Sequence, residues 1–573
     1  MDRTLAALGL LKGVETEFVS SYDVANSGIL LSLPFLESNY LLKDLDKYFA
    51  KLAGYYRLDH IFIVLGFMAL SRIKTPEQLI KISPGEWGKC LGLDRIPAIK
   101  TMRQKINLIS SAPSSYDWSS SVSTSWLNNE NNNDGLVGHF YIDGHVRVYY
   151  GSQTKLPKHY VSREKLCLRS MIDYWVNDEK GQPFFVLTTA LSDGMTKMIR
   201  EDVVPRILKD VKPRYSESEL EADPELHKFV MVYDREAYGY QLMWDMRQIR
   251  VACQTYNKFP KLDWPVSVFS AKDVKRVFGN VEKMMIAEKV LEKDVEVIIE
   301  GKTTKVKLKV REIRVLTESG HQTAIVSTDY KSSSSEIASY MFARWCQENY
   351  FKYMMQDFGI DRLIDYSVQE IDGSSFVISP AYRTLESTGK KQAGKLGSLQ
   401  KKFGTLAIEE EKLAEDDKKS LNIISYKKAQ VLVEIELAQN QLAETKKAKK
   451  ETLKYIKIDD LKENEKFKQL ASPGKHFIDT IKMIAYRAET AMAILIKEWL
   501  PDYATNARSI LKIFYQADAD IIPNKETSVL NIMIHTQTTP TLNKILKNLC
   551  EHLNQTNFIF PGTNLKMNYQ LIE

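Results

Sequence analysis

The sequence predicts a multidomain α/β protein organised around a mixed β-sheet with helices packed on it. Three observations support this fold class. Strand-like and helix-like segments alternate between residues 136 and 256, a β-rich stretch occupies 267–328, and two long segments with heptad-like apolar spacing lie within 385–455. Alternating strands and helices form layered α/β domains, and heptad spacing is typical of paired helices. With 573 residues, the chain has room for roughly three or four domains.

Composition and charge limit the possible functions. The net charge of +6 is small for this length, so a DNA partner would require a locally basic surface. The longest apolar runs, such as residues 60–70, are too short to cross a bilayer, and the N-terminus lacks the pattern of a signal peptide. The five cysteines form no C-x-x-C pair, which argues against a structural zinc site and fits a reducing compartment. We therefore expect a soluble cytoplasmic protein with no membrane partner.

The first region, 1–113, is predicted to be helical. Residues 41–52 and 58–73 place apolar side chains at helical intervals. The Thr-Pro pair at 75–76 is a helix-start signal, because proline at the first helical position already has the backbone angle that a helix requires. The Ser- and Asn-rich stretch 114–134 follows, and its composition predicts a linker or a long loop.

The alternating segments of the core come next. We predict three strands, a helix, a strand, a helix and a strand, at 136–143, 145–150, 183–191, 195–211, 227–234, 237–249 and 250–256. Strands joined by a tight turn are antiparallel, whereas a strand–helix–strand unit makes a parallel pair. A mixed sheet follows, and this order of elements is also that of the ribonuclease-H-like fold. We assign 135–266 and 329–380 to this core.

A β-rich insertion, 267–328, interrupts the predicted core. Its alternating runs are separated by Glu-Gly and Ser-Gly turn signals, which is the pattern of paired strands. A helix from 336 to about 358 follows and returns the chain to the core.

The C-terminal part divides into a helical hairpin and a small α/β region. Apolar residues in 381–475 repeat at heptad-like spacing in two segments: Leu399, Phe403, Leu406 and Leu413, then Val431, Ile435, Ala438 and Leu442. Two long helices folded back on each other would bury this narrow seam. In 476–573 we predict a helix at 477–500, a strand at 528–536, a helix at 541–553 and a hairpin at 558–572.

Two aspartates stand at the ends of predicted core strands. Asp143 ends the first strand and Asp234 ends the fourth. In the predicted topology these strands are neighbours, so both carboxylates would lie at the same edge of the sheet. Two close carboxylates repel each other unless a cation neutralises them, and oxygen-only ligands favour Mg²⁺ or Mn²⁺ over zinc. We expect His145, which is near Asp143, to be an ordinary strand histidine.

A third acid, Glu348, lies on the helix predicted at 336–358. Tyr340, Arg344, Glu348 and Lys352 recur every four residues, so we place them on one helical face. Arg344 and Lys352 flank the glutamate by one turn on each side. This arrangement suits a site where the acid holds a metal ion and the cations hold the phosphates of a DNA backbone.

Each acid also has a purely structural explanation. Asp143 precedes a glycine and would suit a turn, Asp234 precedes a helix and would suit an N-cap, and Glu348 would suit an ion pair on a solvated helix. Their joint placement, on the first strand, the fourth strand and the closing helix of one topology, favours a metal site.

Three segments around these acids resemble a known family. FYIDGHVRVYYG, FVMVYDREAYGY and YMFARWCQENYFKYM look like the DDE transposases of bacterial insertion sequences, in the subgroup with a Tyr–Arg–Glu–Lys signature. LGLDRIPAIKTMRQK, PAYRTLEST and IAYRAETAM extend the resemblance over most of the chain. The signature differs in two places. Tyr340 and Arg344 enclose three residues in place of two, and Met355 stands where the family has lysine, so that Lys352 is the nearest substitute.

The resemblance implies a ribonuclease-H-like transposase that cleaves the DNA ends of an insertion sequence and transfers the strands by two-metal phosphoryl transfer. It implies two Mg²⁺ or Mn²⁺ ions held by the catalytic acids Asp143, Asp234 and Glu348. The DNA contacts expected with it are those of Tyr340, Arg344, Lys352, Arg235 and Lys258. The expected partners are transposon ends, target DNA and a second copy of the chain, in a homodimer on the DNA of a bacterial nucleoid.

Three other functions remain open from the sequence. A nuclease or resolvase on the same fold would share the acids but would not need the insertion. An inactive DNA-binding relic of a transposase would not need three intact acids. A structural coiled-coil protein would account for 385–455 but not for acids at strand ends.

Overall fold

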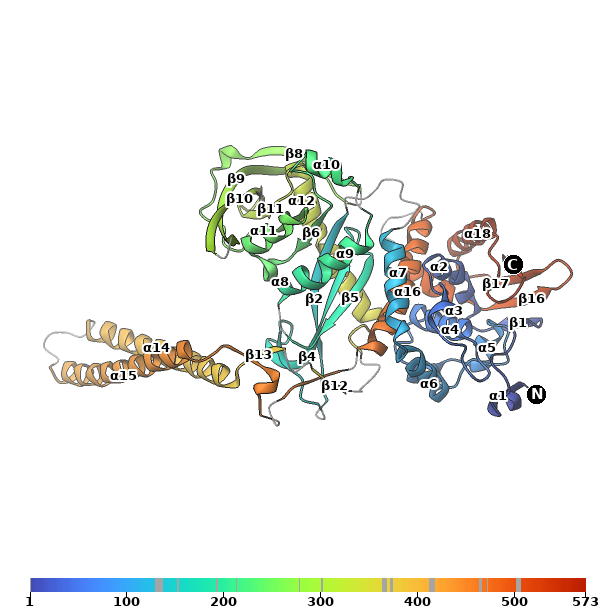
Figure 1. Cartoon of the computed structure of the whole chain (residues 1–573), viewed down its shortest axis with the longest axis horizontal. Coiled ribbons are helices and arrows are strands. Elements are labelled where there is room, and N and C mark those ends of the chain that lie inside the picture. Colours follow the sequence, from blue (N-terminus) through green and yellow to red (C-terminus); the bar gives the residue numbers. More distant parts are fainter. Residues whose placement is uncertain are drawn as a thin grey trace. The chain divides into compact units, whose positions relative to one another are not determined.

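A computed structural model gives the fold of the chain (Figure 1). It describes residues 2–128, 138–151, 154–191, 194–212, 214–277, 279–299, 302–362, 368–371, 375–411, 418–462, 466–470, 472–500 and 506–572. The chain forms two compact units. The first comprises Met1–Tyr150, Lys158–Ser367 and Leu470–Glu573, and the second comprises Gly151–Pro157 and Val368–Gln469.

A mixed sheet lies at the centre of the first unit. Its strands are β2 (His139–Val148), β4 (Leu166–Asn177), β5 (Pro183–Thr189), β6 (Phe229–Tyr233) and β7 (Val251–Tyr256), in the spatial order β5-β4-β2-β6-β7, with β3 (Lys158–Val161) on the far part of β4. The strands β5, β4 and β2 are antiparallel, whereas β2, β6 and β7 are parallel. The predicted mixed sheet is therefore confirmed.

The first part of this sheet differs from the prediction. We expected two strands that meet at Asp143 and Gly144, but β2 runs through both residues without a break. Its antiparallel partner is β4, a strand that we did not predict. Gly144 lies opposite Tyr174 of β4, and a Cβ atom at Gly144 would meet the Tyr174 ring at 3.2 Å. The glycine is there for close packing across the strand pair, and not for a turn.

The β-rich insertion continues the same sheet. Its strands are β8 (Ser270–Lys275), β9 (Val281–Ile299), β10 (Lys302–Leu316) and β11 (Gln322–Ser327). β11 pairs with β7 in antiparallel fashion, and the order continues as β11-β10-β9-β8. The predicted paired strands are confirmed, and the insertion forms one sheet with the core.

Helices cover both faces of the core sheet. Successive side chains of a strand point to opposite faces of the sheet, so Phe140 and Ile142 of β2 enter one hydrophobic core and Tyr141 enters the other. The helical segments near the sheet are α8 (Met195–Met198), the π-turn η3 (Ile199–Val203), α9 (Val204–Asp210), α10 (Glu217–Ala222), α11 (Tyr240–Gln248), α12 (Ser334–Ala343), α13 (Trp345–Tyr353) and the π-turn η6 (Met354–Phe358). The helix predicted at 336–358 is thus interrupted at Arg344 and widened at its end.

The stretch 114–134 contains a helix, so the predicted linker is wrong there. α7 (Ser114–Leu127) buries Trp118, Val122 and Trp126, which recur every four residues. Trp118 packs against rings of α4 (Leu58–Leu70) and α16 (Pro473–Lys497). Three large apolar side chains on one face therefore outweigh the serine-rich composition of the other faces. Residues 129–137 lie outside the described part.

Other helical predictions for the N-terminal region are only partly met. Within 41–52 the helix is confined to α3 (Leu45–Tyr48), because Tyr40 and Asp44 adopt left-handed backbone angles that a continuous helix excludes. The remaining segments are α1 (Asp2–Ala7), η1 (Ser27–Ser32), α2 (Leu33–Ser38), η2 (Pro76–Lys81), α5 (Pro84–Lys89) and α6 (Ile99–Ser110). Of the helices that the structure describes, none combines the length and apolar character needed to cross a bilayer.

The two ends of the chain share a second sheet. Its order is β1-β16-β17-β18, with β1 (Ser21–Val24), β16 (Ala519–Asn524), β17 (Val529–His535) and β18 (Lys566–Ile572), and α17 (Ala507–Tyr515) and α18 (Pro540–Gln555) accompany it. The predicted strand at 528–536 and helix at 541–553 are confirmed. The hairpin predicted at 558–572 is present but short: the bridge between Ile559 and Lys566 and the backbone hydrogen bonds from Phe560 to Leu565 and from Met567 to Phe558 join its arms. β18 itself pairs in parallel with β17, which was not predicted.

The second unit contains the predicted helical hairpin (Figure 1). α14 (Pro380–Glu411) and α15 (Lys418–Glu451) are antiparallel, since Glu386 pairs with Lys449 and Glu410 pairs with Lys428. Five seam residues are buried: Leu399, Val431, Ile435, Ala438 and Leu442. Leu413 lies outside the described residues. Short strand pairs complete the unit, β12 (Val368–Glu370) with β15 (Lys468–Leu470) and β13 (Phe376–Ile378) with β14 (Tyr455–Lys457), beside η7 (Ile458–Asp460).

Candidate active site

The sheet brings Asp143 and Asp234 side by side. β2 and β6 are parallel, and their last paired residues are Ile142 and Tyr233. Each aspartate is the next residue along the chain, Asp143 within β2 and Asp234 directly after β6. Asp143 stays within β2, so it is not the turn residue of the structural explanation. Asp234 precedes η4 (Arg235–Ala237), and within the described structure no backbone N–H donates to its side chain as a helix cap. The predicted adjacency of the two strands is therefore correct.

Asp143 lies in a crowded, negatively charged environment. Its side chain is 22% exposed, its Oδ1 accepts a hydrogen bond from the Gly144 N–H at 2.8 Å, and its Oδ2 lies 3.7 Å from Nη1 of Arg344. Burial raises the pKa of this carboxyl to about 6, and Asp234 and Glu236 add to the effect, although Arg344 and the Gly144 N–H oppose it. Arg344 and the Gly144 N–H therefore offset only part of the cost of burying this carboxylate.

Arg344 joins Glu348 to the two aspartates. It stands at the break between α12 and α13, and its Nη2 donates to Oε1 of Glu348 at 2.8 Å. Burial lowers the pKa of the guanidinium, but Asp234, Asp143 and Glu348 outweigh it, so the pKa is raised overall. Arg344 keeps right-handed helical backbone angles, so Glu348 lies one turn further along, while Nη1 of the same arginine lies near Asp143 on the sheet.

The ligand oxygens of Asp143, Asp234 and Glu348 do not all lie within 4.8 Å of one another. Among the described residues, one group of three His, Cys, Asp or Glu side chains has its ligand atoms all within 4.8 Å of one another. This group is Asp23 of β1, Asp520 of β16 and His535 of β17. The oxygens of Asp143, Asp234 and Glu348 therefore spread more widely than the ligands of a single ion. Two ions about 4 Å apart would span a wider set of ligands.

Two of the predicted DNA contacts lie beside the acids. Arg235 follows Asp234 directly, is exposed, and places its guanidinium 5.6 Å from the ring centre of Tyr256. Lys258 is exposed just beyond the end of β7, and its charge is felt by Glu236. Both cations thus lie at the strand edge that carries the aspartates.

Tyr256 is a site residue that sequence reasoning missed. Burial raises the pKa of its hydroxyl, with Arg344, Asp234, Arg235 and Glu348 as further electrostatic neighbours. The register explains its place, because Tyr233 pairs with Thr255 and the next residues on the two parallel strands are Asp234 and Tyr256. A rule that compares the residues ending each parallel strand would have found it.

The other two signature positions, Tyr340 and Lys352, differ in their surroundings. Lys352 is exposed one turn beyond Glu348, as predicted. Tyr340, in contrast, stacks on His139 at 3.5 Å between ring centres, and its carbonyl accepts the Tyr141 hydroxyl at 2.7 Å. His139 starts the strand, roughly 13 Å before Asp143 along the chain. Tyr340 therefore contacts β2 at its first residue, and its role as a DNA contact stays a prediction.

His145 is a buried strand histidine. Its ring stacks on Phe351 of α13 at 5.6 Å, and burial lowers its pKa to about 4. It therefore stays neutral at ordinary pH and supports the packing of α13 on β2.

Comparison with known proteins places the chain in a family. No curated protein matches it. A family model described as "Transposase protein" matches residues 1–573, so the match includes the core sheet, the helical hairpin and the regions at both ends. Transposases are DNA-processing enzymes of mobile elements, and the acids described above lie within the matched region. The chain belongs to this family of transposase proteins.

Proposed function

We propose that this transposase is of the DDE type, with a ribonuclease-H-like core that cleaves the ends of an insertion sequence and joins them to target DNA. The observation that carries the proposal is the convergence of three acids from separate elements. Asp143 and Asp234 follow the last paired residues of two adjacent parallel strands, and Arg344 ties Glu348 to them. The strand order β5-β4-β2-β6-β7, with its antiparallel and parallel halves, supports the fold assignment.

The donor set fits two Mg²⁺ or Mn²⁺ ions. All three groups are carboxylates, and hard divalent cations prefer oxygen ligands. Burial is the main cause of the raised pKa of Asp143, and a bound cation would stabilise its ionised form. Two ions held by Asp143, Asp234 and Glu348 would supply activation of the attacking water or 3′-hydroxyl and stabilisation of the leaving oxygen.

The cations around the acids have a separate task. Arg344 neutralises Asp143 and Glu348 in the free protein. Once divalent cations neutralise these acids, its planar guanidinium is available to hold a phosphate through two hydrogen bonds. Arg235 and Lys258 are exposed at the same edge and would hold neighbouring phosphates, which positions the DNA without reading its sequence.

The helical hairpin is proposed to contact DNA or a second copy of the chain. Its buried seam holds α14 and α15 together, and many lysines remain on the outer faces. Lysine-rich helices attract phosphates with little sequence preference. A homodimer on DNA would allow two transposon ends to be cut in one complex.

The decisive experiment uses the full chain with DNA that carries the ends of its own element, in Mg²⁺. We expect metal-dependent nicks at the element ends and joined products with target DNA. Asp234→Asn and Glu348→Gln should reduce both to background while DNA binding persists, because phosphate contacts use other residues. The matched controls are Asp273→Asn on β8 and Glu318→Gln between β10 and β11, both exposed in the same unit. Cleavage without joining would favour a nuclease, binding without cleavage would favour an inactive relic, and full activity of Asp234→Asn would refute the site.

A further inference from the structure

The helix that carries Glu348 is a short segment between two irregularities. α13 spans only Trp345–Tyr353, α12 ends just before Arg344, and the π-turn η6 follows directly and ends at Gly359, which has a left-handed backbone. A continuous helix transmits its orientation from one turn to the next through its hydrogen bonds. The backbone stays right-handed helical on both sides of α13, but the regular α-helical hydrogen-bond pattern changes at Arg344 and at the start of η6, so side-chain contacts have to help set the rotation of α13.

One contact holds the N-terminal turn of α13 on the sheet. Gln347, next to Glu348, is buried, and its Nε2 donates to the carbonyl of Tyr141 at 2.9 Å. The carbonyl of Trp175 and the Oδ1 of Asn177 lie at 3.5 Å and 3.4 Å from the same nitrogen. This contact fixes where the helix begins relative to β2 and β4, but not how its far end is turned.

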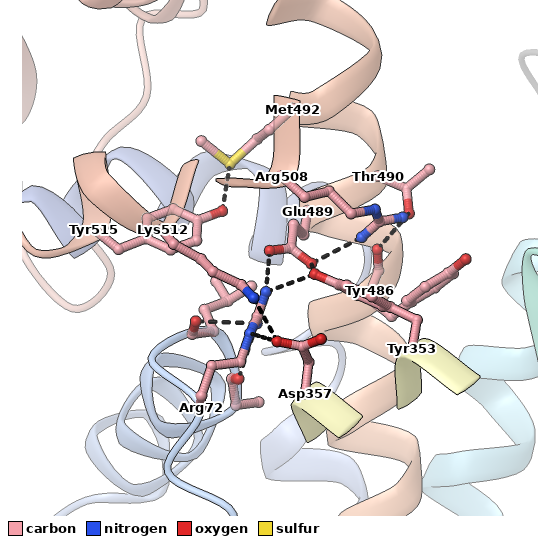
Figure 2. Close-up of polar contacts among 12 residues, drawn as sticks. Arg72, Tyr353, Asp357, Tyr486, Glu489, Thr490, Met492, Arg508, Lys512 and Tyr515 are labelled. Carbon is pink, nitrogen blue, oxygen red and sulfur yellow. Dashed lines mark hydrogen bonds and ion pairs between the residues drawn. The ribbon is translucent and has the colours of Figure 1, made fainter. Parts of the chain in front are cut away.

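The far end of α13 is held by a buried charged cluster (Figure 2). The Tyr353 hydroxyl accepts from Nη2 of Arg72 at 2.7 Å and donates to Oε2 of Glu489 at 2.8 Å. Glu489, on α16, is completely buried and also accepts from Arg72 and, at 2.8 Å, from Arg508. Asp357 of η6 pairs with Arg72 at 3.2 Å, and Lys512 of α17 reaches it as well.

This cluster connects three distant parts of the chain at one carboxylate. Arg72 lies just after α4, Arg508 lies on α17, and Tyr353 ends α13. Burying ions is expensive, and an apolar cluster of similar volume is often no less stable than a buried ion pair. Directional hydrogen bonds differ from apolar packing in one respect, because they specify a single geometry. The cluster therefore suits the task of orienting a helix more than that of stabilising the fold.

We propose that Glu489 is a positioning residue for the transposase reaction: by holding Tyr353, it fixes the rotation of α13 and thus the place of Glu348. This inference rests on the proposed function of Glu348 as a metal ligand. A rotation of about 20° would move a glutamate carboxylate by roughly 2 Å, and catalytic groups tolerate only about 0.5 Å. The same cluster makes the position of Glu348 depend on α4 and α17, so that the regions at both ends of the chain have to be in place before the three acids can act together.

The test uses Tyr353→Phe in the full chain. This variant keeps the ring contacts with Phe358 and Tyr486 and removes only the hydroxyl that meets Arg72 and Glu489. Glu489→Gln is a second variant that removes the charge. The matched control is Tyr515→Phe, which deletes a buried hydroxyl in the same region whose contact is the sulfur of Met492 at 3.3 Å (Figure 2).

Two measurements separate positioning from loss of structure. Amide hydrogen exchange without metal or DNA should speed up in the peptide 345–353 of Tyr353→Phe, while α6 and the Tyr515→Phe protein exchange at the wild-type rate. End cleavage should fall roughly 10- to 100-fold, the Mg²⁺ concentration for half-maximal cleavage should rise several-fold, and DNA affinity should stay unchanged. Unchanged exchange in 345–353, or cleavage equal to that of Tyr515→Phe, would overturn the proposal. If the wild-type chain itself cleaves no DNA, the proposed function fails, and the exchange experiment alone still decides whether Glu489 and Tyr353 hold α13.

Discussion

Replacing Asp143 by asparagine should stabilise the metal-free protein while it abolishes DNA cleavage. The Asp143 side chain is largely buried, and Asp234 and Glu236 add negative charge next to it. Burial and these neighbours raise its pKa to about 6, although Arg344 opposes the shift. The ionised carboxylate is therefore unfavourable in the folded state, and asparagine has the same shape without the charge.

The sign and the size of the effect follow from proton linkage. The ordinary pKa of the group is 3.8, so the folded protein with a pKa of about 6 binds this proton more tightly than the unfolded chain does. The stability that the proton contributes is fully present below pH 3.8 and is lost as the pH rises through 6. The difference between the two pKa values corresponds to roughly 3 kcal/mol. Asp143→Asn should gain at most this amount over the wild type at pH 8, and much less at pH 4.5.

The assay is chemical denaturation at the two pH values in the presence of a chelator. Asp273→Asn, at an exposed position of β8, controls for the change in net charge. Addition of Mg²⁺ should then stabilise the wild type and leave Asp143→Asn almost unchanged, because only the carboxylate binds the ion well. A variant that is less stable than the wild type at pH 8, or a difference that does not depend on pH, would refute the reasoning.

Three further predictions concern other parts of the chain. Burial lowers the pKa of Lys482 to about 7, so the stability that the neutral amine contributes is lost as the pH falls from 10.5 towards 7. Lys482→Met should therefore raise the free energy of unfolding by roughly 2–4 kcal/mol at pH 7 but not at pH 10, even though the hydrogen bond to the Gly359 carbonyl is lost. Thermal unfolding at both pH values measures this difference. Arg344→Lys should keep the melting temperature but reduce strand transfer and make the salt dependence of DNA binding shallower, whereas a merely intrahelical partner of Glu348 would tolerate lysine. Deleting 385–455 should weaken end binding or pairing in a gel-shift assay, and unchanged binding and assembly would mark the hairpin as a spacer.

Much of the candidate site was predictable, because the residues next to a strand end show in the sequence where that strand stops. The apolar runs of β6 and β7 and the apolar spacing of α13 are visible in the sequence, and they lead to Asp234 and Glu348. Asp143 was found for a partly wrong reason, since it lies within β2 and not at a turn. The stacking of Tyr340 on His139 was not predicted, because it depends on how α12 packs against β2.

The sequence by itself determined the elements whose apolar periodicity is strong: the central strands, α16 and the seam of the hairpin. A repeating pattern of apolar residues places them on one face of a helix or strand, and that face is the one that becomes buried. Only the tertiary structure decided that the serine-rich α7 is a helix, that β4 lies between β2 and β5, and that β1 pairs with β16. It also decided the cluster at Glu489, whose partner Arg72 is 417 residues away in the chain. Such contacts have no local signal, because a buried charge is favourable only when its partners arrive from elsewhere, and no short window of sequence contains both.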